Sequence, residues 1–354
     1  MFVAKGFRMR GRISLRGTVR YQLMSASMLS RCTAEVCLRR LLKGPRSPEW
    51  NFAAELATEI LKRRLISAFE LNDVNAARSF LDSVVLETEL TSKVSVSNVV
   101  EGNVRGSWFI PKNASQEKFM LYLHGGGYSF YPKASYHELI AMFAISADIK
   151  TFVLDYRLSP EHKFPAQLND AVDSYRWLLG KGIDPARLVV AGDSAGGNLT
   201  LALLLSIRDL KLPPPALGIC LSPATDFGDG AARLPQESEL DWITQRMALQ
   251  WADWYCPPAE RANPLVSPVN ADLRGLPPIY IQAGGAENLL PSIQDFVDRA
   301  KSQGADVALE VWPAMNHVFQ AFAPEVPQST AALRRIHEVI DARLRTTANP
   351  TAPL

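Results

Sequence analysis

The sequence predicts an α/β fold, in which a mostly parallel sheet is covered by helices on both faces. From residue 117 onward, strand-like apolar runs alternate with runs whose apolar residues recur at helical spacing. This alternation favours parallel strands, because two parallel strands are usually connected by a helix. The chain has 354 residues, enough for one large domain or for one domain with a satellite. Its apolar fraction of 47% and charged fraction of 21% are ordinary for a soluble globular protein.

Before residue 117, the pattern predicts helices within residues 50–85 and a β-hairpin within residues 93–110. The run 52–65 carries a helical apolar stripe, and the hairpin strands alternate around Gly102-Asn103. Six more strands are then expected, at residues 118–125, 151–157, 187–193, 216–222, 276–284 and 307–313. The helices expected between and after them lie at 135–147, 166–180, 197–210, 291–304 and 328–346. Segment 223–275 interrupts the alternation and is too long for an ordinary loop, so we expect an inserted lid there.

The charge is unevenly distributed along the chain. A net charge of +2 is too small to indicate nucleic acid binding, yet residues 1–46 hold eleven Lys/Arg and one acid. The first thirty residues lack the apolar core of a secretory signal, and no stretch of 18 apolar residues predicts a membrane span. An Arg-rich start fits an organelle transit peptide or a membrane-surface segment. We favour an extension that packs on nothing, with the working domain beginning near Met24 or Met28.

The four cysteines show neither CxxC nor metal-binding spacing. They are Cys32, Cys37, Cys220 and Cys256. We therefore expect free thiols in a reducing compartment and a cytoplasmic location, and we expect no metal and no cofactor.

Ser194 is the candidate nucleophile. It lies in Gly192-Asp193-Ser194-Ala195-Gly196, between an expected strand and an expected helix. A serine on such a sharp turn has strained backbone, and the flanking glycines remove side chains that would collide. Its hydroxyl would project at the carboxyl end of the sheet, beside a helix N-terminus that favours developing negative charge.

His317 is the candidate base, because a serine hydroxyl is a poor nucleophile without one. Of the five histidines, only His317 and His337 follow Ser194. His337 lies within an expected helix, whereas His317 lies in a loop just after an expected strand. A loop at the carboxyl end of a strand can bring its side chain to the serine.

The imidazole needs a carboxylate to fix its tautomer and to stabilise its charged form. Glu287 and Asp226 each directly follow an expected strand, and both precede His317. Asp295 and Asp298 lie within an expected helix and are expected to be solvated. Chain order alone does not decide between Glu287 and Asp226.

The run "HGGGY" at 124–128 places three glycines directly after a strand. Acyl transfer puts negative charge on a carbonyl oxygen, and backbone amides aimed at that oxygen lower the barrier by about 3 kcal/mol per donor. Glycines let the substrate approach such amides without obstruction. The run is typical of the oxyanion-binding loop of lipases and esterases.

Five motifs in order resemble the hormone-sensitive-lipase-like esterases, the GDSAG branch of the α/β-hydrolases. They are "HGGGY", "DYRLSPEHKFPA", "GDSAGGN", "GGAENLL" and "NHVF", and the resemblance covers roughly residues 50–345. It implies an α/β-hydrolase fold with a mostly parallel eight-stranded sheet and a helical cap. It also implies a nucleophile at Ser194, a base at His317 and an acid at Glu287. The oxyanion hole would be formed by the amides of Gly126, Gly127 and Ala195.

One departure from that family concerns the acid loop. The family usually has a second acidic residue a few positions after the first, but Pro291-Ser292 stands there in this chain. The resemblance further implies a division into an N-terminal extension with the first part of the cap (1–90), a catalytic domain (91–222 and 276–354) and an inserted cap segment (223–275).

The expected activity is hydrolysis of short- to medium-chain carboxylic esters through an acyl-enzyme. The expected partner is a small-molecule ester, with no nucleic acid and no integral membrane span, and a homodimer is allowed for. An amidase or deacetylase with the same triad, and a non-catalytic small-molecule receptor, are the alternatives. We expect no long apolar surface for docking on lipid. An apolar acyl pocket is expected to draw on the set Trp50, Phe52, Trp108, Trp242, Trp251, Trp254 and Tyr255.

Overall fold

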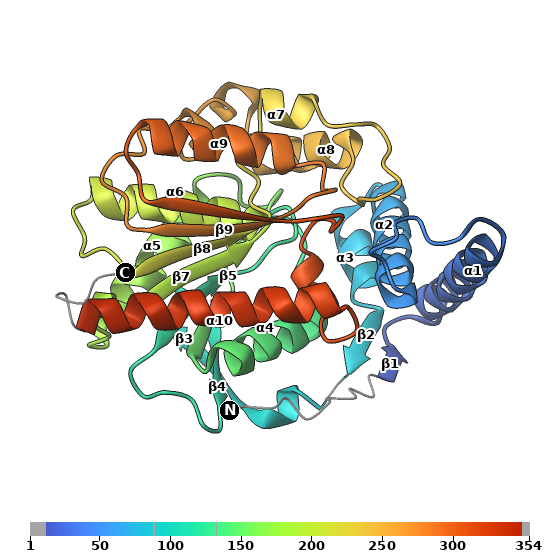
Figure 1. Ribbon diagram of the computed structural model, residues 1–354, viewed down its shortest axis with the longest axis horizontal. Coiled ribbons are helices and arrows are strands. Elements are labelled where there is room, and N and C mark those ends of the chain that lie inside the picture. Colours follow the sequence, from blue (N-terminus) through green and yellow to red (C-terminus); the bar gives the residue numbers. More distant parts are fainter. Residues whose placement is uncertain (1–11, 88, 132, 349–354) are drawn as a thin grey trace.

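The computed structural model describes residues 12–348 except 88 and 132, and its centre is an eight-stranded sheet (Figure 1). The strand order is β10-β9-β8-β7-β5-β6-β4-β3. The five pairs from β10 to β6 are parallel, and β6-β4 and β4-β3 are antiparallel. The expected fold class and hairpin are therefore confirmed. The strands are β3 (Val94–Glu101), β4 (Val104–Pro111), β5 (Phe119–Leu123), β6 (Lys150–Leu154), β7 (Leu188–Asp193), β8 (Leu217–Leu221), β9 (Ile279–Gly284) and β10 (Val307–Trp312).

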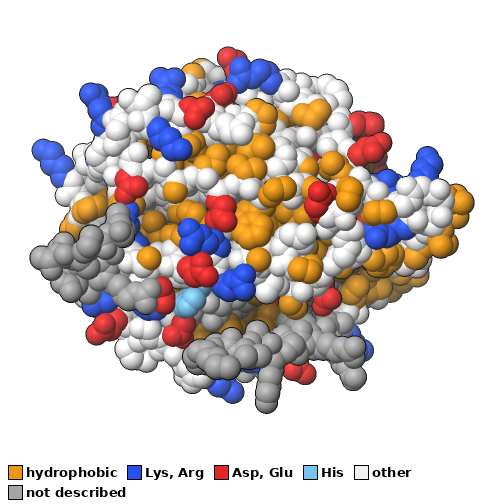
Figure 2. All heavy atoms as spheres, viewed as in Figure 1, with side chains coloured by type: hydrophobic (Ala, Val, Ile, Leu, Met, Phe, Trp, Pro, Cys, Tyr) orange, Lys and Arg blue, Asp and Glu red, His pale blue; other side chains and the backbone are white. Residues whose placement is uncertain are grey.

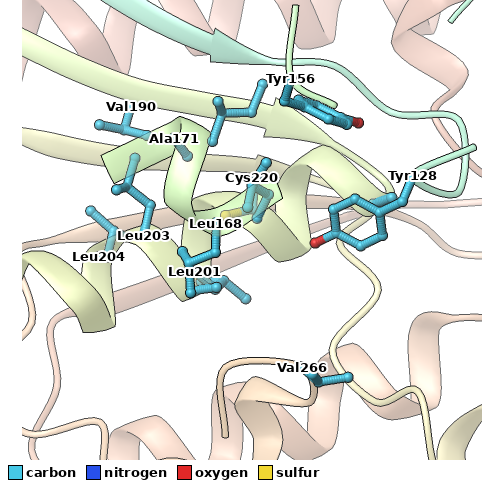
Figure 3. Packing of buried hydrophobic residues seen from close by; sticks show 14 of the residues in the cluster. Tyr128, Tyr156, Leu168, Ala171, Val190, Leu201, Leu203, Leu204, Cys220 and Val266 are labelled. Carbon is cyan, nitrogen blue, oxygen red and sulfur yellow. The ribbon is translucent and has the colours of Figure 1, made fainter. Parts of the chain in front are cut away.

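Helices cover both faces of this sheet. On one face lie α4 (Lys133–Ala147) and α10 (Pro327–Ala348), and on the other lie α5 (Ala166–Gly180), α6 (Ala195–Asp209) and α9 (Leu290–Ser302) (Figure 1). Successive strand residues alternate between the two cores, so that Leu121 and Leu123 belong to one and Met120 and Tyr122 to the other. Figure 3 shows the first core, where side chains of α5 and α6 meet Val190 and Cys220 of the sheet.

The inserted segment 223–275 contains two α-helices, α7 (Asp229–Ala232) and α8 (Gln245–Tyr255). The Thr244 hydroxyl accepts a hydrogen bond from Met247 N and so caps the start of α8. In Figure 1 both helices lie near α9, on the side of the molecule away from α10. Phe69 of the N-terminal helix α2 (Phe52–Glu70) stacks on Trp254 with ring centroids 5.5 Å apart. Two segments far apart in sequence therefore pack together.

The expectation that the residues before Met24 pack on nothing is wrong for residues 12–23. Strand β1 (Arg12–Leu15) pairs antiparallel with β2 (Val84–Glu87). Helix α1 (Val19–Lys43) begins five residues before Met24, and the Thr18 side chain caps it. Met24 and Met28 pack against the hydrophobic core. Residues 1–11 lie outside the described residues. Helix α3 (Val74–Leu81) completes the N-terminal part, where helices were expected.

Candidate active site

Ser194 lies on the sharp turn between β7 and α6, with φ 54° and ψ −118°. This left-handed conformation is strained for a side chain with a Cβ atom, and it aims the hydroxyl away from the sheet. A Cβ atom on Gly196 would lie 1.9 Å from the Leu123 carbonyl oxygen, and one on Gly192 would lie 2.3 Å from the Gly196 carbonyl oxygen. Both flanking glycines are therefore required by close backbone approach.

His317 lies in the loop after β10, and its Nε2 is 2.8 Å from Ser194 Oγ. The side chain is fully buried, and burial lowers its pKa to about 3. A neutral imidazole at this distance can accept the serine proton. The Trp242 indole fixes the loop from the inserted segment, because its Nε1 donates to the His317 carbonyl at 3.0 Å and its ring packs edge-on against the imidazole.

Glu287 lies in the loop after β9, with Oε2 4.0 Å from His317 Nδ1. Oε2 accepts hydrogen bonds from Ser222 Oγ at 2.5 Å and from Gly284 N at 3.0 Å. Burial raises the pKa of Glu287 well above its usual range, and these two donors oppose that rise. Within the described chain, neither Glu287 Oε1 nor His317 Nδ1 has a hydrogen-bond partner. The structure thus brings acid and base together, at a separation longer than a hydrogen bond.

Asp226, the other acid left open by chain order, has its carboxylate engaged elsewhere. Oδ1 accepts from Gly228 N at 2.8 Å, and Oδ2 accepts from Gly230 N at 2.7 Å. Both oxygens therefore stabilise the turn that leads into α7. This carboxylate holds the start of the inserted segment.

Asp241 is a buried carboxylate that stands in none of the sequence motifs. Oδ1 accepts from His317 N at 3.0 Å, and Oδ2 accepts from Asn288 N at 2.8 Å. One side chain of the inserted segment therefore joins the histidine loop to the acid loop. Burial raises the pKa of Asp241 to about 6. An acid between Leu240 and Trp242 is a sequence signal for burial, but nothing in the sequence indicates which loops it meets.

The glycine run forms a tight loop after β5. Gly126 has φ +103°, and its carbonyl accepts from Ser129 N and Phe130 N. A Cβ atom on Gly126 would lie 2.0 Å from the Phe130 carbonyl oxygen, and one on Gly127 would lie 2.4 Å from the Trp251 ring. Among the described residues, no group accepts a hydrogen bond from the Gly126 or Gly127 amide. These amides are therefore available to an anionic oxygen.

Ala195, the third expected donor, is the first residue of α6. Its amide is one of the N–H groups that a helix leaves without an intrahelical partner. The neighbouring Asp193 links this turn to the glycine loop, since its buried carboxylate accepts from Gly125 N at 3.0 Å, Tyr122 OH at 2.8 Å and Tyr136 OH at 3.0 Å. Burial raises the pKa of Asp193 to about 6.

The aromatic residues expected around a pocket divide between the site and other places. Trp251 covers Gly127, and Trp242 packs on His317. Trp108 instead packs on Phe119, at the amino end of β5, so its expected role in the pocket is wrong. Tyr255 stacks on Tyr128, Trp254 stacks on Phe69, Trp50 donates to the Ala314 carbonyl, and Phe52 is exposed.

No group of three or more metal-binding side chains of the kind that holds an ion occurs within residues 12–348, gaps at 88 and 132 aside. Over the same range, no helix is both long and apolar enough to pass through a bilayer.

Comparison with known proteins gives a consistent result. A model of the alpha/beta hydrolase fold family matches residues 120–321. An acetyl-hydrolase of Streptomyces hygroscopicus is 36% identical over 250 residues, which cover 70% of this chain and 82% of that protein. The esterase LipU of Mycobacterium tuberculosis is 31% identical over 272 residues, with coverage of 75% and 90%.

Solved structures agree. An esterase from the bacterial hormone-sensitive lipase family has TM-score 0.69 at 32% identity, covering 90% of this chain and 98% of that one. An esterase/lipase from an uncultured bacterium has TM-score 0.75 at 31% identity, with coverage of 84% and 100%. The chain belongs to the alpha/beta hydrolase fold family. Its resemblance to the hormone-sensitive-lipase-like esterases of that family is confirmed.

Proposed function

We propose that the protein is a serine carboxylesterase that works through an acyl-enzyme. The observation that carries this proposal is the 2.8 Å approach of His317 Nε2 to a serine hydroxyl on a strained strand-to-helix turn. A serine whose only role was packing or contact with water would not need this strained backbone conformation. The esterase names of the relatives support the same class of reaction.

In the first half-reaction, Ser194 Oγ attacks the ester carbonyl carbon and its proton passes to His317 Nε2. The carbonyl oxygen becomes an anion, which the amides of Gly126, Gly127 and Ala195 bind. The tetrahedral intermediate then collapses. The bond from carbon to the alkoxy oxygen breaks, and the alcohol leaves with the proton from His317.

In the second half-reaction, a water molecule attacks the acyl carbon and gives its proton to His317 Nε2. The same amides bind the second oxyanion. Collapse breaks the bond to Ser194 Oγ, which takes the proton back, and the carboxylic acid is released. Glu287 stabilises the imidazolium in both halves, because its Oε2 lies 4.0 Å from Nδ1 in a buried site.

Asp241 and Trp242 act as positioning residues in this proposal. They bind the amide and the carbonyl of His317, and Trp242 also packs on the imidazole ring, so both act by holding the histidine. Because both belong to the inserted segment, the proposed cap (223–275 with the helical part of 1–90) also sets the histidine loop.

The proposed substrates are esters with short to medium acyl chains. Trp251 lies over Gly127 and contacts Phe69 of α2 at 5.3 Å between ring centroids, so bulky aromatic groups of the cap stand next to the oxyanion loop. Such groups limit the length of acyl chain that fits beside Ser194.

The test is a series of p-nitrophenyl esters with acyl chains of 2 to about 16 carbons. We expect kcat/KM to be largest at the short to medium end. Matched p-nitroanilides measure the amidase alternative, because both substrate types pass through the same tetrahedral intermediate. Faster anilide hydrolysis would make the protein an amidase, and no turnover of either series would favour a receptor.

A cytoplasmic location and a homodimer also belong to the proposal. The location is supported by the four free thiols, Cys32, Cys37, Cys220 and Cys256, three of which are buried. Sedimentation velocity tests for the dimer.

A further inference from the structure

Helix α1 packs on the rest of the protein along one side only. Its buried residues are Ser25, Cys32 and Val36, and Ser25 Oγ is 2.8 Å from Ser83 Oγ. Near its C-terminal end, Arg39 and Arg40 each reach the buried Glu55 carboxylate of α2 at 2.8 Å. In Figure 1, α1 extends beyond the outline of the sheet and its covering helices. The helix is therefore firmly attached, with its opposite side facing outward.

The outward side of α1 is apolar. Leu23 and Leu41 are 66% and 83% exposed, and because they are 18 residues apart, or five turns, they lie on the same side. Cys32 stands nine residues from each, or two and a half turns, and so marks the opposite, buried side. Figure 2 shows hydrophobic side chains on this projecting lobe. Of the eleven large hydrophobic residues exposed in the described chain, five lie on α1 and a sixth, Ile13, lies on strand β1; the five are Val19, Leu23, Leu38, Leu41 and Leu42.

The charge around this surface is positive. Arg12, Arg20, Arg31 and Lys43 are exposed, and in the described part of the chain none of them pairs with an acid. The one acid of α1, Glu35, pairs with Arg63 of α2. Residues 1–46 carry eleven Lys/Arg against that single acid, whereas the rest of the chain is net negative. A second copy placed on this face would bring two basic segments together.

We propose that the outward face of α1 binds the surface of a bilayer that contains anionic phospholipid. The helix would lie in the plane of the interface, with the leucines among the acyl chains and the Arg side chains at the headgroups. Anionic headgroups attract basic segments within a Debye length of the surface, so charge and apolar contact act together. The sequence led us to expect no long apolar surface for docking on lipid, and the proposal departs from that expectation at α1, where the exposed leucines lie. The proposal is independent of the proposed chemistry at Ser194.

The first test is flotation of the full chain with phosphatidylcholine vesicles, with and without 30% phosphatidylglycerol. We expect binding to the anionic vesicles that weakens in 0.5 M NaCl, and about tenfold less partitioning in the variant Leu23→Ser/Leu38→Ser/Leu41→Ser/Leu42→Ser. The matched control is Leu210→Ser/Val100→Ser, which removes exposed apolar side chains elsewhere. The control should float like the parent chain. No flotation of the parent, or equal flotation of both variants, would overturn the proposal.

A second readout uses Cys37, the exposed cysteine of the four. It lies 18 residues after Val19 and therefore on the outward side. A polarity-sensitive fluorophore on Cys37 should shift to the blue with anionic vesicles and not with neutral ones. Sedimentation velocity without lipid measures whether the chain forms a dimer. A dimer that the leucine substitutions abolish, in a chain that binds no vesicles, would show that a second copy covers this face. In every variant, unchanged hydrolysis of a soluble ester shows that the fold is intact.

Discussion

The nucleophile half and the acid–histidine half of the site are held in different ways. Ser194 and the glycine loop directly follow the neighbouring central strands β7 and β5. Their backbone is closely packed, because a Cβ atom added at Gly196 or Gly126 would lie 1.9 or 2.0 Å from a backbone oxygen. Glu287 and His317 lie on two loops joined by side chains from elsewhere, chiefly Ser222 and Asp241.

This difference shows which half depends on the cap. Ser222 follows β8, donates to Glu287 and accepts from Val318 N, whereas Asp241 comes from the inserted segment. Rearrangement of the inserted segment would therefore move the base relative to a fixed nucleophile. Such a movement would change the 4.0 Å distance from His317 Nδ1, which has no hydrogen-bond partner in the described chain, to Glu287 Oε2.

The largest expected effect is on the rigid half. Ser194→Ala removes the attacking atom and should lower kcat by at least about four orders of magnitude, because loss of a triad nucleophile is not compensated by the base or the amides. Ser194 is only partly exposed, but the substitution removes a single hydroxyl and leaves no large cavity, so the melting temperature should change little. Steady-state kinetics on one soluble ester measure the loss. Substantial turnover by the purified variant would contradict the serine mechanism.

Glu287→Gln tests the acid–histidine half. The substitution keeps the shape of the side chain but removes the charge that stabilises the imidazolium, so turnover should fall by two or more orders of magnitude. Asp226→Asn is the matched control, because its carboxylate only accepts two turn amides, and it should lose far less. If Asp226→Asn is the crippled variant, the acid assignment is wrong although the nucleophile and base would stand.

Glu287→Gln should also change the pH dependence of kcat/KM. The base must be neutral, so activity falls as pH drops through the pKa of His317. Burial lowers that pKa, and the Glu287 carboxylate opposes the effect by favouring the imidazolium. In Glu287→Gln the acidic limb of kcat/KM should therefore move to lower pH. A limb that stays in place or moves upward would show that Glu287 carries no charge near the base.

Matched Asp→Asn substitutions at Asp241 and Asp193 allow a direct comparison of the two halves of the site. Both oxygens of Asp241 accept from backbone amides, so Asp241→Asn places an NH₂ group against an N–H donor. We expect about a tenfold loss in kcat with KM little changed, from one buried unsatisfied donor. In Asp193→Asn the NH₂ group can face Tyr136 OH, which can accept, so the loss should be below about threefold. Equal losses in both variants would show that the two halves are equally dependent on side chains.

The smallest expected effect concerns the N-terminus. A chain that starts at Met24 loses strand β1, the Thr18 cap and the first turn of α1. Loss of a helix cap alone costs about 1 kcal/mol, so the melting temperature should fall by a few degrees. Hydrolysis of a soluble ester should be nearly unchanged, since β1 and β2 form a separate two-stranded sheet. An unchanged melting temperature would mean that this sheet contributes nothing to stability.

The sequence was most informative where one local signal determines both structure and chemistry. Gly192, Gly196 and the glycine run mark close backbone approaches, and each lies beside the atoms that the chemistry needs. The strands and helices from residue 117 onward were predicted for the same reason, because their apolar periodicity is local.

The parts that sequence did not reveal depend on long-range contacts. Asp241 is an acid in a cap segment, and its partners, His317 and Asn288, lie 76 and 47 residues away. Strand β1 is four residues long and pairs with β2 about seventy residues later, so neither has a clear pattern of its own. Trp108 and Trp251 are likewise separated by long-range packing. Trp108 meets Phe119 at the amino end of β5, whereas Trp251 meets Gly127 in the loop after the carboxyl end of β5.

The most direct test of the proposed mechanism is to map a fluorophosphonate adduct by mass spectrometry while following ester hydrolysis. We expect one adduct per chain on Ser194, with hydrolysis lost in proportion to labelling. Glu287→Gln should label much more slowly at the same serine, and Ser194→Ala should not label. An adduct on another residue, or full hydrolysis by a fully labelled chain, would contradict the assignment of Ser194 as the nucleophile.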